Sequence, residues 1–152
     1  MNRLKYPYFF IIITILWSGM IAGISFLEAP VKFTAPSLTL PIGLDVGRHV
    51  FGAFNKVEIV FGTILMLLIF MKKSPLLLKL PCFLAVILLI LETFWLLPVL
   101  DKRALIIIAG QSPEGASPHT WYIVFEAIKL ISLLIAGSLG IRTLINRAPS
   151  DL

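Results

Sequence analysis

Four long apolar segments dominate this sequence, and short polar stretches rich in lysine, arginine and proline separate them. The segments cover residues 8–27, 46–71, 76–97 and 119–141. A helix needs about 20 mostly apolar residues to cross the hydrocarbon core of a bilayer, and each segment meets that requirement. The sequence therefore predicts one all-α domain over residues 1–152, an integral membrane antiparallel four-helix bundle.

The composition supports a membrane location. Hydrophobic residues make up 59% of the chain and charged residues 14%, whereas soluble domains are nearer half apolar and a quarter charged. The net charge of +5 does not point to nucleic acid, because the lysines and arginines mostly flank the apolar segments, as in membrane proteins. We expect the lipid bilayer as partner and no nucleic acid. The single cysteine, Cys82, excludes an intramolecular disulfide, a cysteine zinc cluster and a Cys-x-x-Cys pair.

The basic residues also predict an orientation. Cytoplasmic loops of membrane proteins carry the excess of Lys and Arg. One side would hold Arg3, Lys5, Lys72, Lys73, Lys79, Arg142 and Arg147, and the other Lys32, Arg48, Lys102 and Arg103. Both termini are therefore expected in the cytoplasm of a multi-pass protein, in the inner membrane if the source is bacterial. The first segment is too long for a signal-peptide core and no Ala-x-Ala site follows it, so we interpret it as a retained helix.

Each apolar segment contains one glutamate or is directly followed by one: Glu28, Glu58, Glu92 and Glu126. A charge at the centre of a bilayer costs about 2.5–3.5 kcal/mol on insertion scales, and such residues usually face the bundle interior and mark a site or pathway. Glu58 lies about 16 Å along its helix from Gly47, near mid-membrane. On the predicted topology all four acids lie in the outer half or at the centre. We expect them to line one cavity that opens outward.

Helical spacing adds further polar residues to this predicted site. His119, Tyr122, Glu126 and Lys129 share one helix face, as do Arg48, Phe51, Asn55, Glu58 and Gly62, and Ser18, Ile21, Ser25 and Glu28. The candidate ligand- or ion-binding residues are Glu58, Glu126, Glu92, Glu28, Asn55, Lys129, His119, His49 and Arg48.

Structural interpretations compete with the functional ones. Glu126 and Lys129 could simply neutralise each other, Arg48 could pair with Asp45, and His119 begins a helix in the interfacial aromatic belt. Trp17 is interpreted as a packing residue.

These residues predict a small polytopic membrane protein that handles an ion or small ligand, by transport or binding, at an intramembrane site of glutamates and histidines. Because four helices make a thin bundle, a transport pathway could involve a homo-oligomer. One alternative is a membrane-embedded, metal- or haem-dependent enzyme acting on a lipophilic substrate, although no catalytic motif supports a particular reaction. Another is a structural or assembly subunit of a larger membrane complex.

Two cofactors are compatible with the residue types. A metal ion could bind Glu58, Glu126 and His119, although the Glu-x-x-His pattern of di-metal carboxylate bundles is absent. A non-covalent haem on His49 and His119 ranks below the metal, since no Cys-x-x-Cys-His motif exists.

Two short elements carry a resemblance to known proteins. Ala29-Pro30-Val31-Lys32-Phe33 and Gly47-Arg48-His49-Val50-Phe51-Gly52 resemble small four-span membrane families of unknown function, of the transmembrane-protein-two-hundred-five-like kind. The resemblance covers roughly residues 1–60. It implies a four-helix membrane fold and does not imply an activity.

Overall fold

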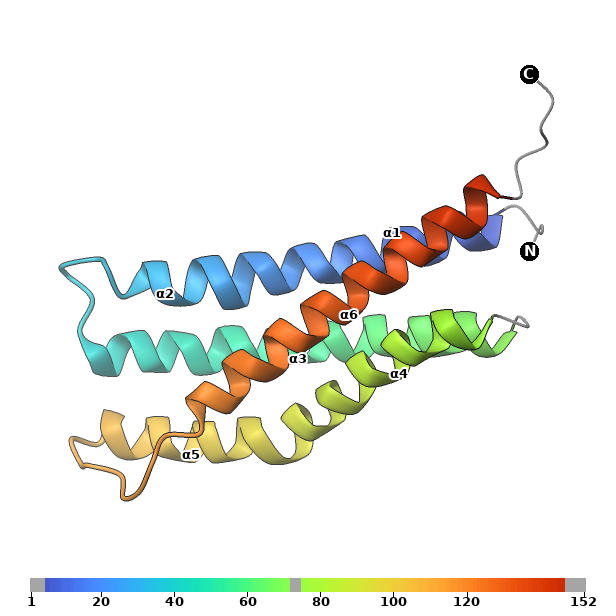
Figure 1. Ribbon diagram of the computed structural model, residues 1–152. Coiled ribbons are helices and arrows are strands. Elements are labelled where there is room, and N and C mark those ends of the chain that lie inside the picture. The colour runs from blue at the N-terminus through green and yellow to red at the C-terminus, as the bar shows by residue number, and fades with distance from the viewer. Residues whose placement is uncertain (1–4, 72–74, 147–152) are drawn as a thin grey trace.

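The computed structural model describes residues 5–71 and 75–146, and within them every regular element is helical (Figure 1). The first span consists of α1 (Lys5–Ile21), a π-helical segment (Ala22–Glu28) and α2 (Ala29–Lys32); the second is α3 (Leu40–Met71). The third consists of α4 (Leu76–Leu91), a second π-helical segment (Glu92–Leu96) and α5 (Leu97–Ile108); the fourth is α6 (His119–Ile145).

Four continuous helical stretches are long and apolar enough to cross a membrane. They are Pro7–Lys32, Leu40–Met71, Leu76–Ile108 and His119–Ile145. These stretches confirm the all-α prediction and the prediction of four helices of membrane-spanning length.

The first and third helical stretches extend beyond the predicted segments, through Pro30 and Pro98. The sequence predicts that the first span ends by residue 27 and that the third ends at residue 97, before Pro98. Instead, helix continues through Pro30 to Lys32 and through Pro98 to Ile108. The connection between the first two spans therefore shrinks to residues 33–39.

The π-helical segments explain how the prolines are accommodated. Each segment ends two residues before a proline, Pro30 or Pro98. A proline ring clashes with the carbonyl of residue i−4, which here belongs to Phe26 or Phe94, inside the π-helical segment. The wider i→i+5 turn gives that carbonyl room, so the helix continues. The third span also changes direction between α4 and α5 (Figure 1), as expected where a π-bulge and a proline coincide.

The four spans pack around a shared interior. α6 contacts α1 and α4 most extensively, while α3 contacts α1, α4 and α5. Connections 33–39 and 109–118 lie at the same end of the molecule (Figure 1). Gly137 and Gly140 bring α6 close to α1: a Cβ placed on either would lie 3.0 Å from an atom of Thr14 or Phe10, respectively.

Apolar side chains cover the outside of the bundle and polar ones lie inside it, as expected for a protein surrounded by lipid. Large apolar side chains point outward, among them Phe94, Leu76 and Phe70, which are 80%, 69% and 67% exposed. Eight polar or charged side chains are buried: Thr14, Ser18, Asn55, Glu58, Glu92, Glu126, Lys129 and Ser132. A soluble protein would place most of these groups in water. The ionisable ones converge on one place in the bundle.

Candidate functional site

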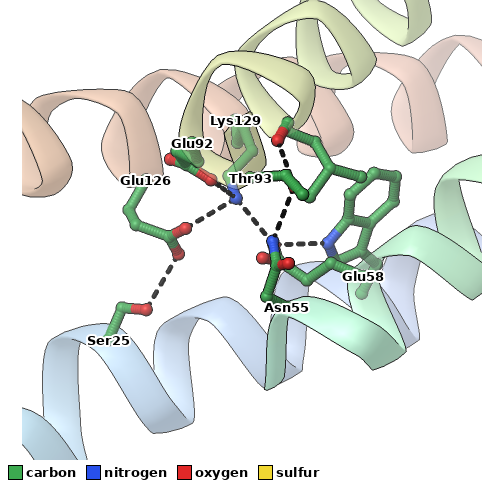
Figure 2. Close-up of polar contacts among 9 residues, drawn as sticks. Ser25, Asn55, Glu58, Glu92, Thr93, Glu126 and Lys129 are labelled. Carbon is green, nitrogen blue, oxygen red and sulfur yellow. Dashed lines mark hydrogen bonds and ion pairs between the residues drawn. The ribbon is translucent and has the colours of Figure 1, made fainter. Parts of the chain in front are cut away.

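Lys129 of α6 lies at the centre of a group of three carboxylates. Its Nζ is 2.7 Å from Glu58 Oε1 and 2.6 Å from Glu126 Oε1, and it also contacts Glu92 Oε2 (Figure 2). The four side chains are 0–2% exposed. We refer to Glu58, Glu92, Glu126 and Lys129 as the Lys129 cluster.

Three of the spans supply these four residues. Glu126 and Lys129 lie three residues apart on α6, a spacing that places both on one helix face. Glu58 projects from α3, and Glu92 is the first residue of the second π-helical segment. π-Helical turns inside longer helices occur frequently at functional sites.

The first span supplies hydrogen-bond donors to the cluster instead of a carboxylate. The indole N–H of Trp17 donates to Glu58 Oε1 at 2.9 Å, and the Ser25 hydroxyl donates to Glu126 Oε2 at 2.8 Å. Ser25 lies in the first π-helical segment. Both π-helical segments therefore contribute a side chain to one polar centre.

Asn55 joins α3 to the second π-helical segment beside the cluster. Its Nδ2 donates to Thr93 Oγ1 at 2.9 Å, and Thr93 Oγ1 donates to the Leu89 carbonyl at 2.7 Å (Figure 2). Asn55 lies one helical turn before Glu58, so this bond helps to fix the rotation of α3 next to the cluster.

The charges in the cluster do not balance. One ammonium group faces three carboxylates, so with all four groups ionised two negative charges remain uncompensated. Among the described residues, Glu92 Oε1 is buried and has no hydrogen-bond partner. Glu126 Oε1 contacts Lys129 as an ion pair but forms no aligned hydrogen bond. Buried carboxylate oxygens are normally satisfied, so a water molecule, a ligand or a proton is expected at this oxygen.

An aromatic layer separates the cluster from the end of the bundle where α6 begins. Tyr122 lies one turn before Glu126 and is 4% exposed. Its ring stacks on His119 at 6.4 Å between centroids and meets the edge of Phe51 at 5.2 Å. Lys32 Nζ lies 5.3 Å from the centroid of the Phe51 ring. The side chains of the Lys129 cluster are buried, so the structure does not show the outward opening that the sequence predicts.

The structure brings four of the predicted site residues together and leaves others outside. Glu58, Glu92, Glu126 and Lys129 meet, and Asn55 is adjacent. Glu28 instead pairs with Lys32 one turn later on the same helix, 3.4 Å away, and its side chain is 36% exposed.

Arg48 and the two histidines have other partners. Arg48 Nε donates to Asp101 Oδ1 at 2.6 Å, and its Nη1 donates to Asp45 at 3.3 Å. The expected Asp45 pair thus exists alongside an interhelical one. The His49 side chain is 75% exposed, and its Nδ1 lies 2.8 Å from the Asp45 carbonyl. His119 is also exposed.

These positions bear on the two predicted cofactor sites. In the part of the chain that the structure describes, the carboxylate oxygens that lie within 4.8 Å of one another belong to Glu58, Glu92 and Glu126. That set replaces the expected His119 with Glu92. Neither histidine is among the residues that contact the Lys129 cluster, so a haem held by His49 and His119 would be separate from it.

Sequence reasoning missed three residues around the cluster. Ser25 lies on a predicted polar face but was not singled out. Trp17 was interpreted as a packing residue, although a buried indole N–H usually has an acceptor, and that rule points to a carboxylate. No feature of the sequence marked Thr93 as a residue of the site.

Comparisons of the chain with protein-family models, curated proteins and solved structures find no match. The resemblance of residues 29–33 and 47–52 to four-span families stays a prediction. The functional argument therefore depends on the geometry of the cluster.

Proposed function

We propose that this chain is an antiparallel four-helix membrane bundle, with both termini cytoplasmic, that binds a cation at the Lys129 cluster and passes it across the bilayer. One observation carries the proposal: three buried carboxylates share a single ammonium group. Ionisable residues that face the interior of a membrane bundle commonly mark ion pathways.

A purely structural role would need fewer charges. Burial costs several kcal/mol for each ion, and well-packed apolar residues often stabilise a protein as well as a buried ion pair does. Glu126 alone would neutralise Lys129, and the two lie on the same helix. When ionised, Glu58 and Glu92 add negative charge that no described side chain balances, which favours a positively charged ligand.

The depth of the cluster suits a transport site. Lys129 lies about 15 Å along α6 from His119, and secondary transporters hold their substrates near the bilayer midplane. The aromatic layer of Phe51, Tyr122 and His119 lies between the cluster and the predicted outer surface. Opening that layer would give the outward access that the sequence predicts.

The test is cation flux into liposomes that contain the purified full chain. The probes are radiolabelled Na⁺, Ca²⁺, Mn²⁺ and methylammonium, with an internal dye for protons. We expect at least one probe to enter faster than into empty liposomes. Glu58→Gln should reduce that flux by about tenfold or more, the effect of losing about 1.4 kcal/mol of binding free energy.

Glu114→Gln is the matched control, because Glu114 is exposed in the 109–118 connection and the same charge is removed far from the cluster. Wild-type flux in both Glu58→Gln and Glu126→Gln, or no flux of any probe, would refute the proposal.

A further inference from the structure

A second lysine, Lys56 of α3, lies on the outside of the bundle at nearly the same depth as the Lys129 cluster. It comes just before Glu58, about 3 Å away along the helix axis, and the helical turn points the two side chains to opposite sides of α3. Lys56 is exposed, and its neighbours Ile59 and Val60 are apolar and 42% and 56% exposed. Lys56 therefore faces the region that lipid chains fill.

Lys56 has no counter-charge within the described part of the chain. In residues 5–71 and 75–146, no side chain forms an ion pair or hydrogen bond with its ammonium group. A lone charge among lipid chains is costly, and such residues usually pair with one another or face a polar interior. The position of Lys56 therefore calls for an anion from outside the bundle.

A lipid headgroup is a poor source of that anion, because Lys56 lies far from both ends of its helix. Lysines near a membrane surface extend their side chains to the headgroups. The next polar side chain on this face, towards the start of α3, is His49, about 10 Å away along the axis. That distance exceeds the length of a lysine side chain. In the other direction α3 continues for about 22 Å to Met71.

The surface beside Lys56 allows another helix to approach closely. Side chains on a helix lean over the preceding turn, which here presents Gly52 and Ala53, both exposed. A Cβ added at Gly52 would meet no atom within 4 Å, so no other span covers it. Small residues on membrane helices let a second backbone come near. We refer to Gly52, Ala53, Lys56 and Val60 as the Lys56 face.

A second copy of this chain does not supply the missing anion. Two copies related by a two-fold axis would pack the Lys56 face of one against the same face of the other, and two ammonium groups would then meet at one depth. The described carboxylates outside the Lys129 cluster lie nearer the end of the bundle that holds connections 33–39 and 109–118; they are Glu28, Asp45, Asp101 and Glu114. The anion must therefore come from a different protein.

From these observations we infer that the Lys56 face docks a transmembrane helix of a different protein, and that this helix carries an aspartate or glutamate at the depth of Lys56. The carboxylate neutralises the lysine, while Gly52 and Ala53 let the two backbones approach. The Lys56 face and the Lys129 cluster lie on opposite sides of α3, so this inference does not depend on cation binding at the cluster.

The experiment measures energy transfer, in phosphatidylcholine liposomes, between the full chain and a labelled synthetic transmembrane helix of leucine and alanine. The chain carries its dye on the cysteine of a Cys82→Ala/Ser112→Cys variant. We expect the peptide with one central aspartate to bind about tenfold or more tightly than the same peptide with leucine there. Lys56→Met should abolish this preference, and Lys56→Arg should keep it. Lys102→Met is the matched control, because Lys102 is an exposed lysine of α5 away from the Lys56 face.

Three results would overturn the inference. The first is equal binding of the aspartate and leucine peptides, or a preference that survives Lys56→Met. The second is a preference that disappears when phosphatidylglycerol is added to the bilayer, which would assign Lys56 to a lipid phosphate. The third is energy transfer between two labelled copies of the chain that Lys56→Met abolishes, which would assign the face to self-association. None of these results would alter the cation flux predicted for the Lys129 cluster, so the two proposals fail separately.

Discussion

The indole N–H of Trp17 and the ammonium group of Lys129 meet at one oxygen atom, Glu58 Oε1, at distances of 2.9 and 2.7 Å. Trp17 lies on α1, Glu58 on α3 and Lys129 on α6. A single carboxylate oxygen thus joins three of the four spans. The tryptophan is completely buried, so its N–H could not hydrogen-bond to water instead.

Replacing Trp17 by Phe removes this donor and keeps an aromatic ring. We expect the free energy of unfolding in detergent to fall by about 1.5–3 kcal/mol, because a hydrogen bond to a charged group is lost. Titration with SDS, followed by circular dichroism, measures the change. Trp121→Phe is the matched control, since Trp121 is 58% exposed. Equal stability of the two variants would show that the bond contributes nothing.

Replacing Lys129 by Met preserves much of the side chain's length but removes its charge. Three carboxylates then remain buried without a counter-ion, and breaking a buried pair in this way costs about 3–5 kcal/mol. We expect low yield or an early transition in the same SDS titration. The double variant Lys129→Met/Glu126→Gln should recover part of the loss, because it removes one of the uncompensated charges. No recovery would mean that Lys129 stabilises the bundle by packing rather than by charge.

The ion pair between Arg48 and Asp101 should matter much less. The two side chains are 24% and 46% exposed, and Arg48 also contacts Asp45. Surface pairs of this kind contribute about 0–1 kcal/mol, so Asp101→Asn should change stability only slightly. A loss as large as that of Lys129→Met would show that this contact between α3 and α5 stabilises the bundle as much as the cluster does.

The predicted orientation can be tested by cysteine labelling. In a Cys82→Ala background, a cysteine at Ser112 should react with a membrane-impermeant maleimide added to intact cells. A cysteine at Asn146 should react only after the membrane is permeabilised. Both positions are exposed, so access rather than burial decides the result. The reverse pattern would place the aromatic layer of Phe51, Tyr122 and His119 on the cytoplasmic side.

The second π-helical segment provides a further test, because its wide turn contains one residue more than an α-helical turn would. Phe94 is 80% exposed and faces away from the bundle. Phe94→Ala keeps the number of residues and should have little effect. Deleting Phe94 removes the same side chain and rotates the following residues by about 100°. The deletion should therefore lower both stability and cation flux clearly more than Phe94→Ala does. Equal behaviour would show that the wide turn has no role in placing Glu92.

Local physics made much of this architecture predictable from the sequence. The length of an apolar run determines whether a helix can span a bilayer, and the cost of a buried charge marks Glu58, Glu92 and Glu126 as interior residues. Both properties can be assessed without knowing how the helices pack. The meeting of these glutamates with Lys129 was an expectation that depended on helix rotation, which periodicity alone leaves open.

The failures share a physical cause. Glu28 follows Ser25 on an ideal α-helical face, but the π-helical turns of residues 22–28 break that periodicity. Ser25 therefore reaches Glu126 while Glu28 pairs with Lys32 at the surface. The predicted end of the third segment at residue 97 was wrong, because standard helix rules do not include the wider turn that accommodates Pro98.

Because of the π-helical turn, the geometry of the cluster depends on the number of residues in the helix as well as on which polar residues it contains. Glu92 is the first residue of the wide turn, and Asp101 lies after that turn, in α5. With one residue fewer, a regular helix could not point Glu92 at Lys129 and Asp101 at Arg48 together. Natural variation that keeps every polar residue but changes the length of this helix by one residue would therefore break one of these two contacts. In this chain, an insertion or deletion can be as consequential as the loss of a glutamate.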